Sequence, residues 1–351
     1  MRRICRILIV AAVLATAITP LLAVQAAPSL ARTSKASTLR VGLGILDGIN
    51  DDGFNALADQ GLKQAEAQLH VKANVIVTQQ TGNYVPTLQA FVNDHDNLII
   101  AVGALWGNDV YQVASANKNV RFAIVDGYPL DSKNHIHHLK NVATLQFKSQ
   151  QSGYIAGVIA GLLEKHKVGA AKHNVIAALG AIPLPFINAQ MCGYWQGAKS
   201  VDKNVKFVDA YVGGFFSIPQ AQAIGQQQIQ DDHADILFGV ADASGLGYYK
   251  AAKEAHKYAI GFAADQDGLG SFMLTSAEVG INVAVFRIIK EDANGTFWPN
   301  EHVFSIKNGG IGYAKNMHHV PAKIRQTAAT VAADLASGKI VANPACKLPS
   351  S

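Results

Sequence analysis

The chain has 351 residues, of which 30 are Lys or Arg and 25 are Asp or Glu, so its formal net charge is +5. Three of the basic residues, Arg2, Arg3 and Arg6, lie in a leader-like segment, and the rest of the chain is nearly neutral at +2. This balance gives no support to nucleic-acid binding. About 325 residues remain beyond the leader, which fits two domains, and no later apolar stretch reaches the roughly 18 residues of a membrane span.

The first 26 residues have the pattern of a secretory signal peptide. A positive start is followed by the apolar stretch 7–24 and by small residues at Ala26 and Ala27. An apolar stretch that runs directly into small residues is typical of a cleaved leader and not of a membrane anchor. We predict cleavage after Ala26 and a soluble exported product, most simply periplasmic. No cysteine follows that position, and Cys5 lies in the charged start, so lipid attachment is not expected.

Short β-rich segments alternate with helix-like segments along the rest of the chain. Strands are predicted at residues 39–46, 71–77, 98–102, 120–125, 141–147, 175–179, 205–212, 236–240 and 259–262. Helices are predicted at residues 54–69, 85–92, 109–116, 151–164, 187–200, 219–230, 246–255, 281–290 and 322–336. Alternation with continuously apolar strands indicates the α/β class, with parallel sheets covered by helices on both faces. Two lobes of four to six strands are expected, because one open sheet of this size would be unusual.

Two polar, turn-rich segments mark where the chain is expected to change lobes. Residues 127–140 form the main break, and EDANGTFWPNEH at residues 291–302 forms another. Several crossings would make a hinge that lets two lobes close over a ligand. The expected limits are a linker over 27–37, a first lobe from 38–140 plus 268–296, a second lobe from 141–267 plus 297–343, and a tail over 344–351.

Two cysteines remain in the predicted mature chain, Cys192 and Cys346. An oxidising compartment permits a disulfide between them. They lie far apart in the sequence, and no spacing motif supports pairing. Both a bridge and two buried thiols are compatible with the sequence, and two buried thiols is the simpler interpretation.

The ends of the predicted strands carry the candidate binding residues, because ligands of open parallel sheets bind beyond the carboxyl ends of the strands. Aromatic residues and neutral or acidic hydrogen-bonding groups recur there, whereas Arg and Lys are nearly absent. Such a lining suits a flat, uncharged, heteroatom-rich molecule and suits phosphate or carboxylate ligands poorly. The candidates are Asn50, Asp51, Asp52, Phe54 and Asn55 after the first strand, Trp106, Asn108 and Asp109 after the third, Asp126 after the fourth, Phe215 and Phe216 after the seventh, Asp242 and Ser244 after the eighth, and Asp265 and Gln266 after the ninth.

Each kind of candidate also has a purely structural interpretation. Either aspartate before the first helix can cap that helix. Phe54 can be a core residue of the same helix, and Trp106 can pack beneath its loop. If the segment that holds Phe215 and Phe216 is extended, the two side chains point in opposite directions. At most one of them would then face the cleft, and we favour Phe215.

Other patterns in the chain do not support a cofactor, a metal or catalysis. GLGILDG at residues 42–48 is loosely similar to a dinucleotide-binding loop, but the second strand ends in TQQ with no acid for a ribose hydroxyl. The histidines of HIHH at residues 135–138 and the pair at 318–319 lie in loops without supporting carboxylates or cysteines, which favours solvated loops over a metal site. No GxSxG, HExxH or P-loop motif is present.

An ordered set of segments over residues 38–343 resembles the basic membrane protein family of substrate-binding proteins, which includes purine-nucleoside receptors. Single motifs in this set are weak, but their order is specific. The similar segments are INDDGFN after the first strand, FKSQQSGYIAGVIAG, MCGYWQGAK, YVGGFFSIPQAQ, ADILFGVADASGLG, AIGFAADQ and LTSAEVGINVAV.

This resemblance implies a type I periplasmic-binding fold with two Rossmann-like lobes. It also implies that the protein delivers a nucleoside-like ligand to an ABC permease in the inner membrane. The family holds a purine between aromatic rings, which correspond here to Phe54 and Phe215. The residues that fall on the family's ligand-facing segments are Asn55, Asp109, Asp242 and Gly245.

Two departures from the family pattern bear on the ligand. The family's last strand reads Gly-x-Asp-x-Asp-Gln, and its first Asp holds ribose hydroxyls. Ala263 occupies that position here, and Val279 stands where the family places a Lys. A site built to bind a hydroxyl rejects ligands that lack it, so these losses relax the demand for ribose. The hypothesis is a free purine base or a related flat heterocycle, with an intact nucleoside second.

The leading hypothesis for function is therefore a monomeric uptake receptor that needs no cofactor. A periplasmic sensor that docks on a signalling receptor would share its fold. A secreted nucleoside-processing enzyme is the rival class. It would need a general acid or a nucleophile in the cleft, and Asp126 or Asp265 would be the candidates.

Overall fold

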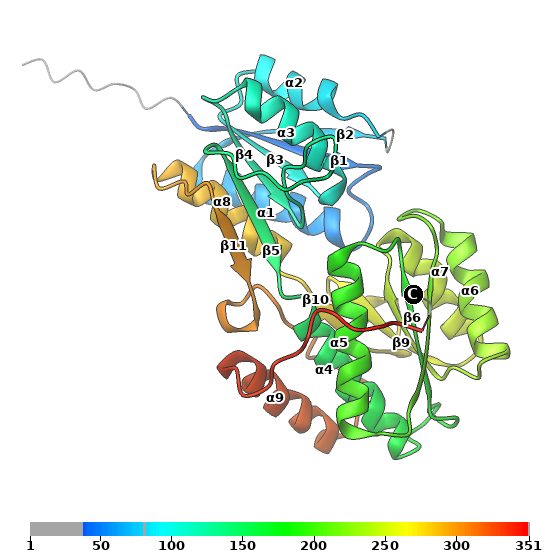
Figure 1. Ribbon diagram of the computed structural model, residues 1–351. Coiled ribbons are helices and arrows are strands. Elements are labelled where there is room, and N and C mark those ends of the chain that lie inside the picture. The colour runs from blue at the N-terminus through cyan, green and yellow to red at the C-terminus, as the bar shows by residue number, and fades with distance from the viewer. Residues whose placement is uncertain (1–37, 80–81, 350–351) are drawn as a thin grey trace, which may run out of the picture. The chain divides into compact units, whose positions relative to one another are not determined.

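The computed structural model describes residues 38–79 and 82–349, and the predicted signal peptide and linker lie outside these residues. Two parallel sheets organise this part of the chain (Figure 1). The first sheet has the strand order β11-β5-β4-β3-β1-β2, and the second has the order β10-β9-β8-β6-β7. The α/β class with two parallel sheets is thus confirmed.

The first sheet and its helices form lobe 1. Hydrophobic side chains project from both faces of its strands, and helices pack against both faces. Side chains such as Leu43 and Ile100 belong to the core that includes α1 and α8. Those such as Ile99 and Phe122 pack with α2 and α3. The elements of lobe 1 are β1 (Arg40–Leu46), α1 (Phe54–Leu69), β2 (Lys72–Thr78), α2 (Val85–Asn93), β3 (Leu98–Val102), the 3-10 helix η1 (Ala104–Trp106), α3 (Gly107–Ala116), β4 (Arg121–Val125), β5 (Val142–Phe147), α8 (Ile281–Ala293) and β11 (Glu301–Phe304).

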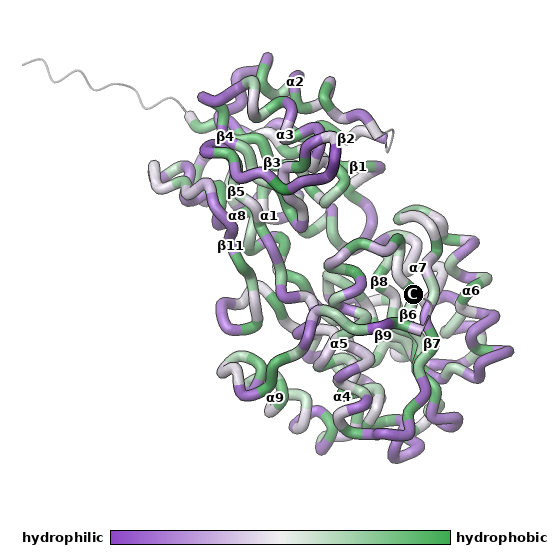
Figure 2. Tube along the Cα trace, in the orientation of Figure 1, coloured by the Kyte–Doolittle hydropathy of each residue, from purple (hydrophilic) through white to green (hydrophobic). Residues whose placement is uncertain are grey.

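The second sheet and its helices form lobe 2. Figure 2 shows that hydrophobic residues concentrate on the strands of both lobes, as expected for sheets buried on both faces. The elements of lobe 2 are α4 (Gln150–Lys165), β6 (Val175–Gly180), α5 (Pro185–Val201), β7 (Lys206–Tyr211), α6 (Ile218–Gln230), β8 (Ile236–Val240), α7 (Ala243–Glu254), β9 (Tyr258–Ala263), η2 (Asp267–Leu269), β10 (Met273–Glu278), η3 (Ile306–Asn308) and α9 (Ala322–Ser337).

Helices α4 and α5 pack so closely that glycines are required between them. A Cβ atom on Gly157 of α4 would overlap the carbonyl oxygen of Tyr194, and one on Gly193 of α5 would overlap that of Gln150. The two backbones are therefore in direct contact over two helical turns. None of the helices in residues 38–79 and 82–349 combines the length and the apolar character needed to cross a membrane.

Three strands join a different sheet from the one expected from the sequence. β5 pairs with β4 in lobe 1, so the polar segment 127–140 is a loop of lobe 1 and not the crossing. β10 pairs with β9 in lobe 2, and β11 pairs with β5 in lobe 1. The sequence carries the strand-forming pattern of β5 but does not show which strand pairs with it, and no strand was predicted at β10 or at β11.

The chain crosses between the lobes, within the described residues, after β5, after β10 and after β11. Hydrogen bonds tie the crossings together: Lys148 N–H donates to the Phe304 carbonyl at 2.8 Å, and Gly280 N–H donates to the Gly310 carbonyl at 2.9 Å. The three connections therefore lie side by side, which is the arrangement of a hinge.

The two cysteines form a disulfide, Cys192–Cys346, with a Cα–Cα distance of 5.6 Å. The simpler expectation of two buried thiols was wrong. The bridge links the segment after α9 to α5, and a reciprocal pair of hydrogen bonds between Gln196 and Asn343 lies beside it. A contact between residues 154 positions apart leaves no local pattern in the sequence.

Candidate functional site

A mostly apolar cavity of about 40 Å³ lies at the carboxyl ends of strands from both lobes. Ligand pockets in proteins have volumes of about 300–1,000 Å³ and are mostly apolar, so this cavity has the character of a ligand pocket but is closed to the size of a few water molecules and has to widen to admit a ligand. Its charged lining residues are acidic, and no Lys or Arg lines it among the residues that the structure describes. The lining comprises Leu46, Asp47, Phe54, Asn55, Val102, Gly103, Ala104 and Leu105 from lobe 1, and Leu184, Phe186, Phe215, Phe216 and Asp242 from lobe 2.

The turn between β1 and α1 is organised by the Asp51 side chain. Its carboxylate accepts the backbone N–H groups of Gly53 at 3.0 Å, Asn55 at 2.7 Å and Ala56 at 3.0 Å. These donors have no partner within a helix of their own, so Asp51 caps the start of α1. Burial raises the pKa of Asp51, although these three hydrogen bonds oppose the rise. The structural interpretation therefore holds for Asp51, which does not line the cavity.

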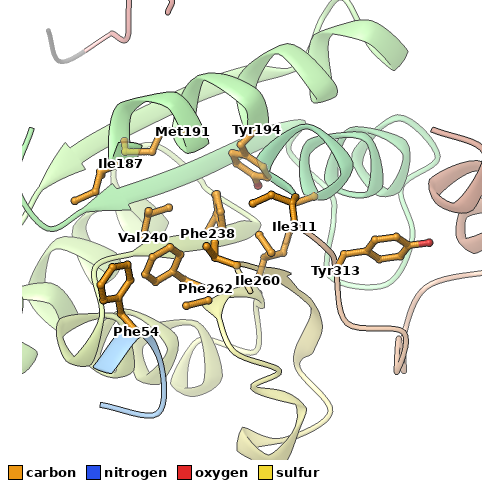
Figure 3. Packing of buried hydrophobic residues seen from close by; sticks show 14 of the residues in the cluster. Phe54, Ile187, Met191, Tyr194, Phe238, Val240, Ile260, Phe262, Ile311 and Tyr313 are labelled. Carbon is orange, nitrogen blue, oxygen red and sulfur yellow. The ribbon is translucent and has the colours of Figure 1, made fainter. Parts of the chain in front are cut away.

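Phe54 and Asn55 are the first two residues of α1, and both line the cavity. The Phe54 ring projects from lobe 1 toward the hydrophobic core of lobe 2 (Figure 3), where Val240 and Phe262 are also buried. The amide of Asn55 donates to the carbonyls of Leu46 at 3.0 Å and Gly48 at 2.8 Å. Since both amide hydrogens are used within the turn, Asn55 can offer a ligand only its Oδ1 acceptor.

Phe186 is the aromatic partner of Phe54. The two rings are stacked, with centroids 6.2 Å apart and planes inclined by 24°. Phe186 is the second residue of α5 and follows β6. Phe186 was not among the residues predicted from the sequence, since none of those candidates follows the strand at 175–179. The same strand-end rule applied to GAIPLPF at residues 180–186 would have found it.

Phe215 and Phe216 both line the cavity, which corrects the expectation that only one of them could face it. Alternation of side chains requires an extended strand. The chain instead bends over residues 213–216, beginning at Gly213 with a φ of +88°. The bend turns both rings to the same side, and Phe216 is 40% exposed.

Asp242 follows β8 and brings a carboxyl group to the cavity wall. Its Oδ1 is buried and has no hydrogen-bond partner among the described residues. Burial raises the pKa of this carboxyl well above its ordinary value, and the nearby Asp51 and Asp126 carboxyls raise it further. The surroundings of Asp242 therefore favour the protonated form of its carboxyl group.

Asp126 lies behind the cavity lining, after β4. Its side chain is buried, and burial raises its pKa to about 8, with the backbone N–H of Phe147 opposing the rise. Its effect on the pKa of Asp242 shows that it lies within electrostatic reach of the cavity.

Four further candidates from the sequence do not line this cavity. Trp106 is fully buried; its Nε1 donates to the Val102 carbonyl at 3.1 Å, and its ring packs on Tyr84, so the packing interpretation holds. Asp109 accepts the backbone N–H groups at the start of α2. Gly245 is buried in α7 against the Tyr249 ring. Asp265 is exposed and accepts the N–H of Asp267 at 3.1 Å.

Asp265 lines a separate groove between α1 and η2. There the side-chain amide of Gln266 in lobe 2 donates to the backbone carbonyl of Asp52 in lobe 1 at 3.2 Å. The oxygen of the same amide accepts the N–H of Phe262 at 3.1 Å. This hydrogen bond joins the lobes at the edge of the site.

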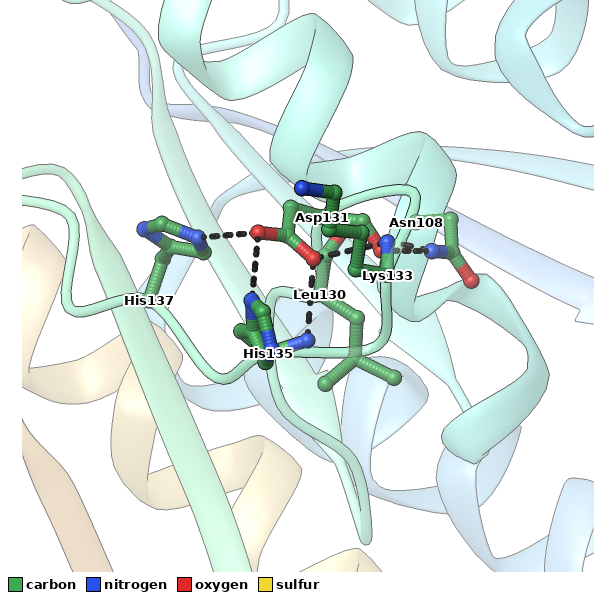
Figure 4. Close-up of polar contacts among 6 residues, drawn as sticks. All are labelled: Asn108, Leu130, Asp131, Lys133, His135 and His137. Atoms are coloured by element: carbon green, nitrogen blue, oxygen red, sulfur yellow. Dashed lines mark hydrogen bonds and ion pairs between the residues drawn. The ribbon is translucent and has the colours of Figure 1, made fainter.

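The histidine-rich loop is held together by one carboxylate. Asp131 Oδ2 contacts His135 Nδ1 at 3.2 Å and His137 Nε2 at 3.1 Å (Figure 4). These contacts and two backbone N–H groups hold the pKa of Asp131 well below its usual range. In residues 38–79 and 82–349 no group of three or more His, Cys, Asp or Glu side chains is placed to hold a metal ion.

Two lobes with parallel sheets, side-by-side crossings and a cavity at the strand ends define a type I periplasmic binding protein. The same fold occurs in an ABC transporter solute-binding protein from Aeropyrum pernix K1, with a TM-score of 0.76 and 21% identity over 87% of this chain and 94% of that one. The chain belongs to the Bmp family, described as ABC transporter substrate-binding protein PnrA-like, whose model matches residues 38–335.

Two relatives illustrate the family. Basic membrane protein D of Borreliella burgdorferi (strain JD1) is 29% identical over 279 residues, which cover 78% of each chain. The ABC transporter nucleoside-binding protein BmpA of Lactococcus lactis subsp. cremoris is 26% identical over 317 residues, which cover 84% of this chain and 86% of that protein. Proteins of this kind are extracytoplasmic, bind a small molecule and act with a permease.

Proposed function

We propose that this protein is the receptor of an ABC importer and that it captures a purine base, or a related flat heterocycle, between its two lobes. The observation that carries the proposal is the pair of stacked rings, Phe54 and Phe186, which face each other from different lobes. A planar ring held between them would be covered on both faces by apolar carbon.

The two rings have to separate before a ligand can bind between them. A planar ligand between two parallel rings needs about 7 Å between the ring planes, which is two contact distances of about 3.5 Å. The centroids of Phe54 and Phe186 are 6.2 Å apart, and this distance includes any lateral offset of the rings. The lobes are therefore expected to open at the hinge to admit a ring system and to close again around it.

The polar groups of the cavity favour a neutral ligand rich in N–H donors. Asn55 has only its oxygen free, and Asp47 and Asp242 are carboxyl groups. An anionic ligand would meet these acids without a compensating Arg or Lys among the described lining residues, which is unfavourable.

The free base is favoured over the nucleoside by the apolar character of the positions that resemble the family's sugar site. Ala263 and Val279 are buried, and Val279 N–H donates to the Ala263 carbonyl at 3.0 Å. A Cβ atom at Gly53 of lobe 1 would lie 4.0 Å from that of Ala263, so little space separates the lobes here. An intact nucleoside is the second candidate, because the Lactococcus lactis relative is named a nucleoside-binding protein.

The proposed setting is the periplasm, after removal of the signal peptide and without lipid attachment. We propose a monomer that passes its ligand unchanged to a permease in the inner membrane and catalyses no reaction. The extracytoplasmic location of the family and the absence of a catalytic motif in the sequence support this proposal.

Isothermal titration of the purified mature protein with adenine, guanine, hypoxanthine, xanthine and their ribosides tests the ligand class. Tighter binding of at least one free base than of its riboside is expected. Tight binding of ribosides alone would refute the free-base proposal and favour the nucleoside. Mass spectrometry of the small molecules released from the purified protein gives an independent identification, and recovery of the titrated ligand unchanged distinguishes a receptor from an enzyme.

A further inference from the structure

A side chain of lobe 2 reaches the turn of lobe 1 at the edge of the cavity. Gln266, which follows β9, donates from its side-chain amide to the backbone carbonyl of Asp52 at 3.2 Å. Asp52 belongs to the turn between β1 and α1, so both groups lie outside the three crossing segments of the hinge. A hydrogen bond between such groups forms only while the two lobes are close together.

The donor is held in place within lobe 2. Gln266 is 6% exposed. Its side-chain oxygen accepts the N–H of Phe262 at 3.1 Å, and its own backbone N–H donates to Ser276 Oγ at 3.0 Å. The oxygen is thus committed to lobe 2, and the amide nitrogen is the part of the side chain that remains for lobe 1.

The acceptor is equally well ordered within lobe 1. The three N–H groups that bind the Asp51 carboxylate, at 2.7 to 3.0 Å, all follow Asp52 in the chain. Asp52 itself has a φ of +48°, in the left-handed region that Asp adopts more readily than most residues. The same turn lies against lobe 2, since a Cβ atom on Gly53 would be 4.0 Å from the Cβ of Ala263. The hydrogen bond therefore joins two ordered groups, and little conformational entropy is lost when it forms.

The turn that Gln266 contacts also carries the lobe 1 ring of the clamp. Phe54 follows Asp52 by two positions and lines the cavity. The contacts of Asp51 make this turn and the start of α1 one unit, so a bond to the Asp52 carbonyl also fixes Phe54 relative to lobe 2. A cavity of only about 40 Å³ shows that the lobes are closed on each other in this arrangement.

We infer that Gln266 is a positioning residue and that its hydrogen bond to the Asp52 carbonyl is a latch, which stabilises the closed arrangement of the lobes and sets the position of Phe54 in it. When the lobes separate, this bond has to break, whereas the bonds of Gln266 to Phe262 and Ser276 lie within lobe 2 and persist. A ligand held between the lobes binds the closed arrangement, so the latch raises the apparent affinity by raising the closed population. The inference concerns closure and does not depend on which ligand the site takes.

Double electron–electron resonance between two spin labels measures the closure directly. The labels are attached through Gln112→Cys in α3 and Gln226→Cys in α6, which are exposed positions on different lobes. Small molecules that copurify with the protein are first removed by dialysis against urea, followed by refolding, so that the latch is measured without the contribution of a ligand.

Two variants separate the latch from a purely structural role of Gln266 in lobe 2. Gln266→Glu keeps an acceptor for the Phe262 N–H and, when ionised at pH 8, offers no donor to the Asp52 carbonyl. Gln266→Met has a side chain of similar length and removes both the donor and the acceptor. Gln60→Ala is the control, because it removes a side-chain hydrogen bond inside lobe 1, from Asn282 to Gln60 at 3.0 Å.

The wild type is expected to show a population at the inter-label distance of the closed arrangement. The ratio of closed to open molecules should fall about 2- to 12-fold in both Gln266 variants, as for the loss of one neutral hydrogen bond, and should stay unchanged in Gln60→Ala. Gln266→Met should in addition lower the free energy of unfolding, because the Phe262 N–H loses its acceptor.

A wild type without a closed population, or an equal ratio in the wild type and both Gln266 variants, would overturn the inference. A fall in Gln266→Met alone would assign Gln266 a structural role within lobe 2 and would overturn it as well. Failure of every base and riboside to bind would refute the proposed function and leave the result of the distance measurement unchanged.

Discussion

Replacement of Phe186 by alanine is the most direct test of the aromatic clamp, because Phe186 is the lobe 2 ring of the clamp and its side chain is only partly buried. The Phe186 ring covers one face of the space that the Phe54 ring covers from the other side, at a centroid distance of 6.2 Å. Stacking of a base on one aromatic ring contributes about 1–3 kcal/mol. Phe186→Ala should therefore weaken binding of the preferred base by about 5- to 150-fold.

The effect on folding should be small, because the Phe186 side chain is only partly buried. Phe54 is 6% exposed and belongs to the main core, so Phe54→Ala should lower both the affinity and the free energy of unfolding, the latter by about 3 kcal/mol. Phe272, also partly buried in lobe 2 but away from the cavity, provides the matched control. Phe272→Ala should leave the dissociation constant unchanged.

The assay is isothermal titration of the three variants with the base that binds the wild type most tightly, together with thermal unfolding of each. A dissociation constant for Phe186→Ala within twofold of the wild type would refute the clamp as assigned here. If Phe215→Ala then showed the loss instead, the ligand would stack on Phe215, as the family resemblance implies.

Three further predictions concern stability. Reduction of the Cys192–Cys346 disulfide, or replacement of both cysteines by serine, should lower the free energy of unfolding by about 2–5 kcal/mol in urea titrations. The reason is that the disulfide links residues 154 positions apart and so restricts the unfolded chain. No change would show that the disulfide is not formed. Burial and the nearby Asp235 raise the pKa of Glu164 to about 8, above its value in the unfolded chain. The folded state therefore keeps a proton that the unfolded state has lost, and the free energy of unfolding should fall as pH rises from about 5 to about 8. Glu164→Gln should flatten this fall, and an equally steep fall in the variant would contradict the assignment. Gly157→Ala should lower the free energy of unfolding by about 3 kcal/mol or more, because its methyl group would overlap a backbone carbonyl that no side-chain rotation can move. Gly268→Ala is the control, since Gly268 has open space around it, and it should leave the free energy of unfolding unchanged in the same urea titration.

Most of the secondary structure could be predicted because the sheets are parallel and buried on both faces. Their strands are continuous apolar runs bounded by polar turns, and such runs are visible without knowledge of the fold. β10 and β11 lack this signal: β10 is interrupted by a register shift, and β11 is an edge strand with alternating exposure. The sheet that a strand joins depends on its partner across the fold, and for this reason β5 was assigned to the wrong lobe.

The candidate site was predicted in part, and the differences have physical causes. Phe54, Asn55, Phe215 and Asp242 line the cavity as the strand-end rule predicts. Trp106 also follows a strand, but its indole N–H needed an acceptor and found it in the carbonyl that ends β3. A strand-end rule locates the region in which a side chain begins, and it does not determine whether the side chain points into the cavity or into the core.

The glycine contacts between α4 and α5 have a consequence for the thermodynamics of binding. Because backbone lies directly on backbone there, α5 resists sliding and rotation against its neighbour, so the helix that carries Phe186 keeps its position before any ligand arrives. The backbone of this half of the clamp is preorganised, so ligand binding loses little backbone entropy on that side. The entropy that binding does lose should come from the movement of one lobe relative to the other, and a bound ligand should therefore restrict the hinge far more than it restricts the interior of lobe 2.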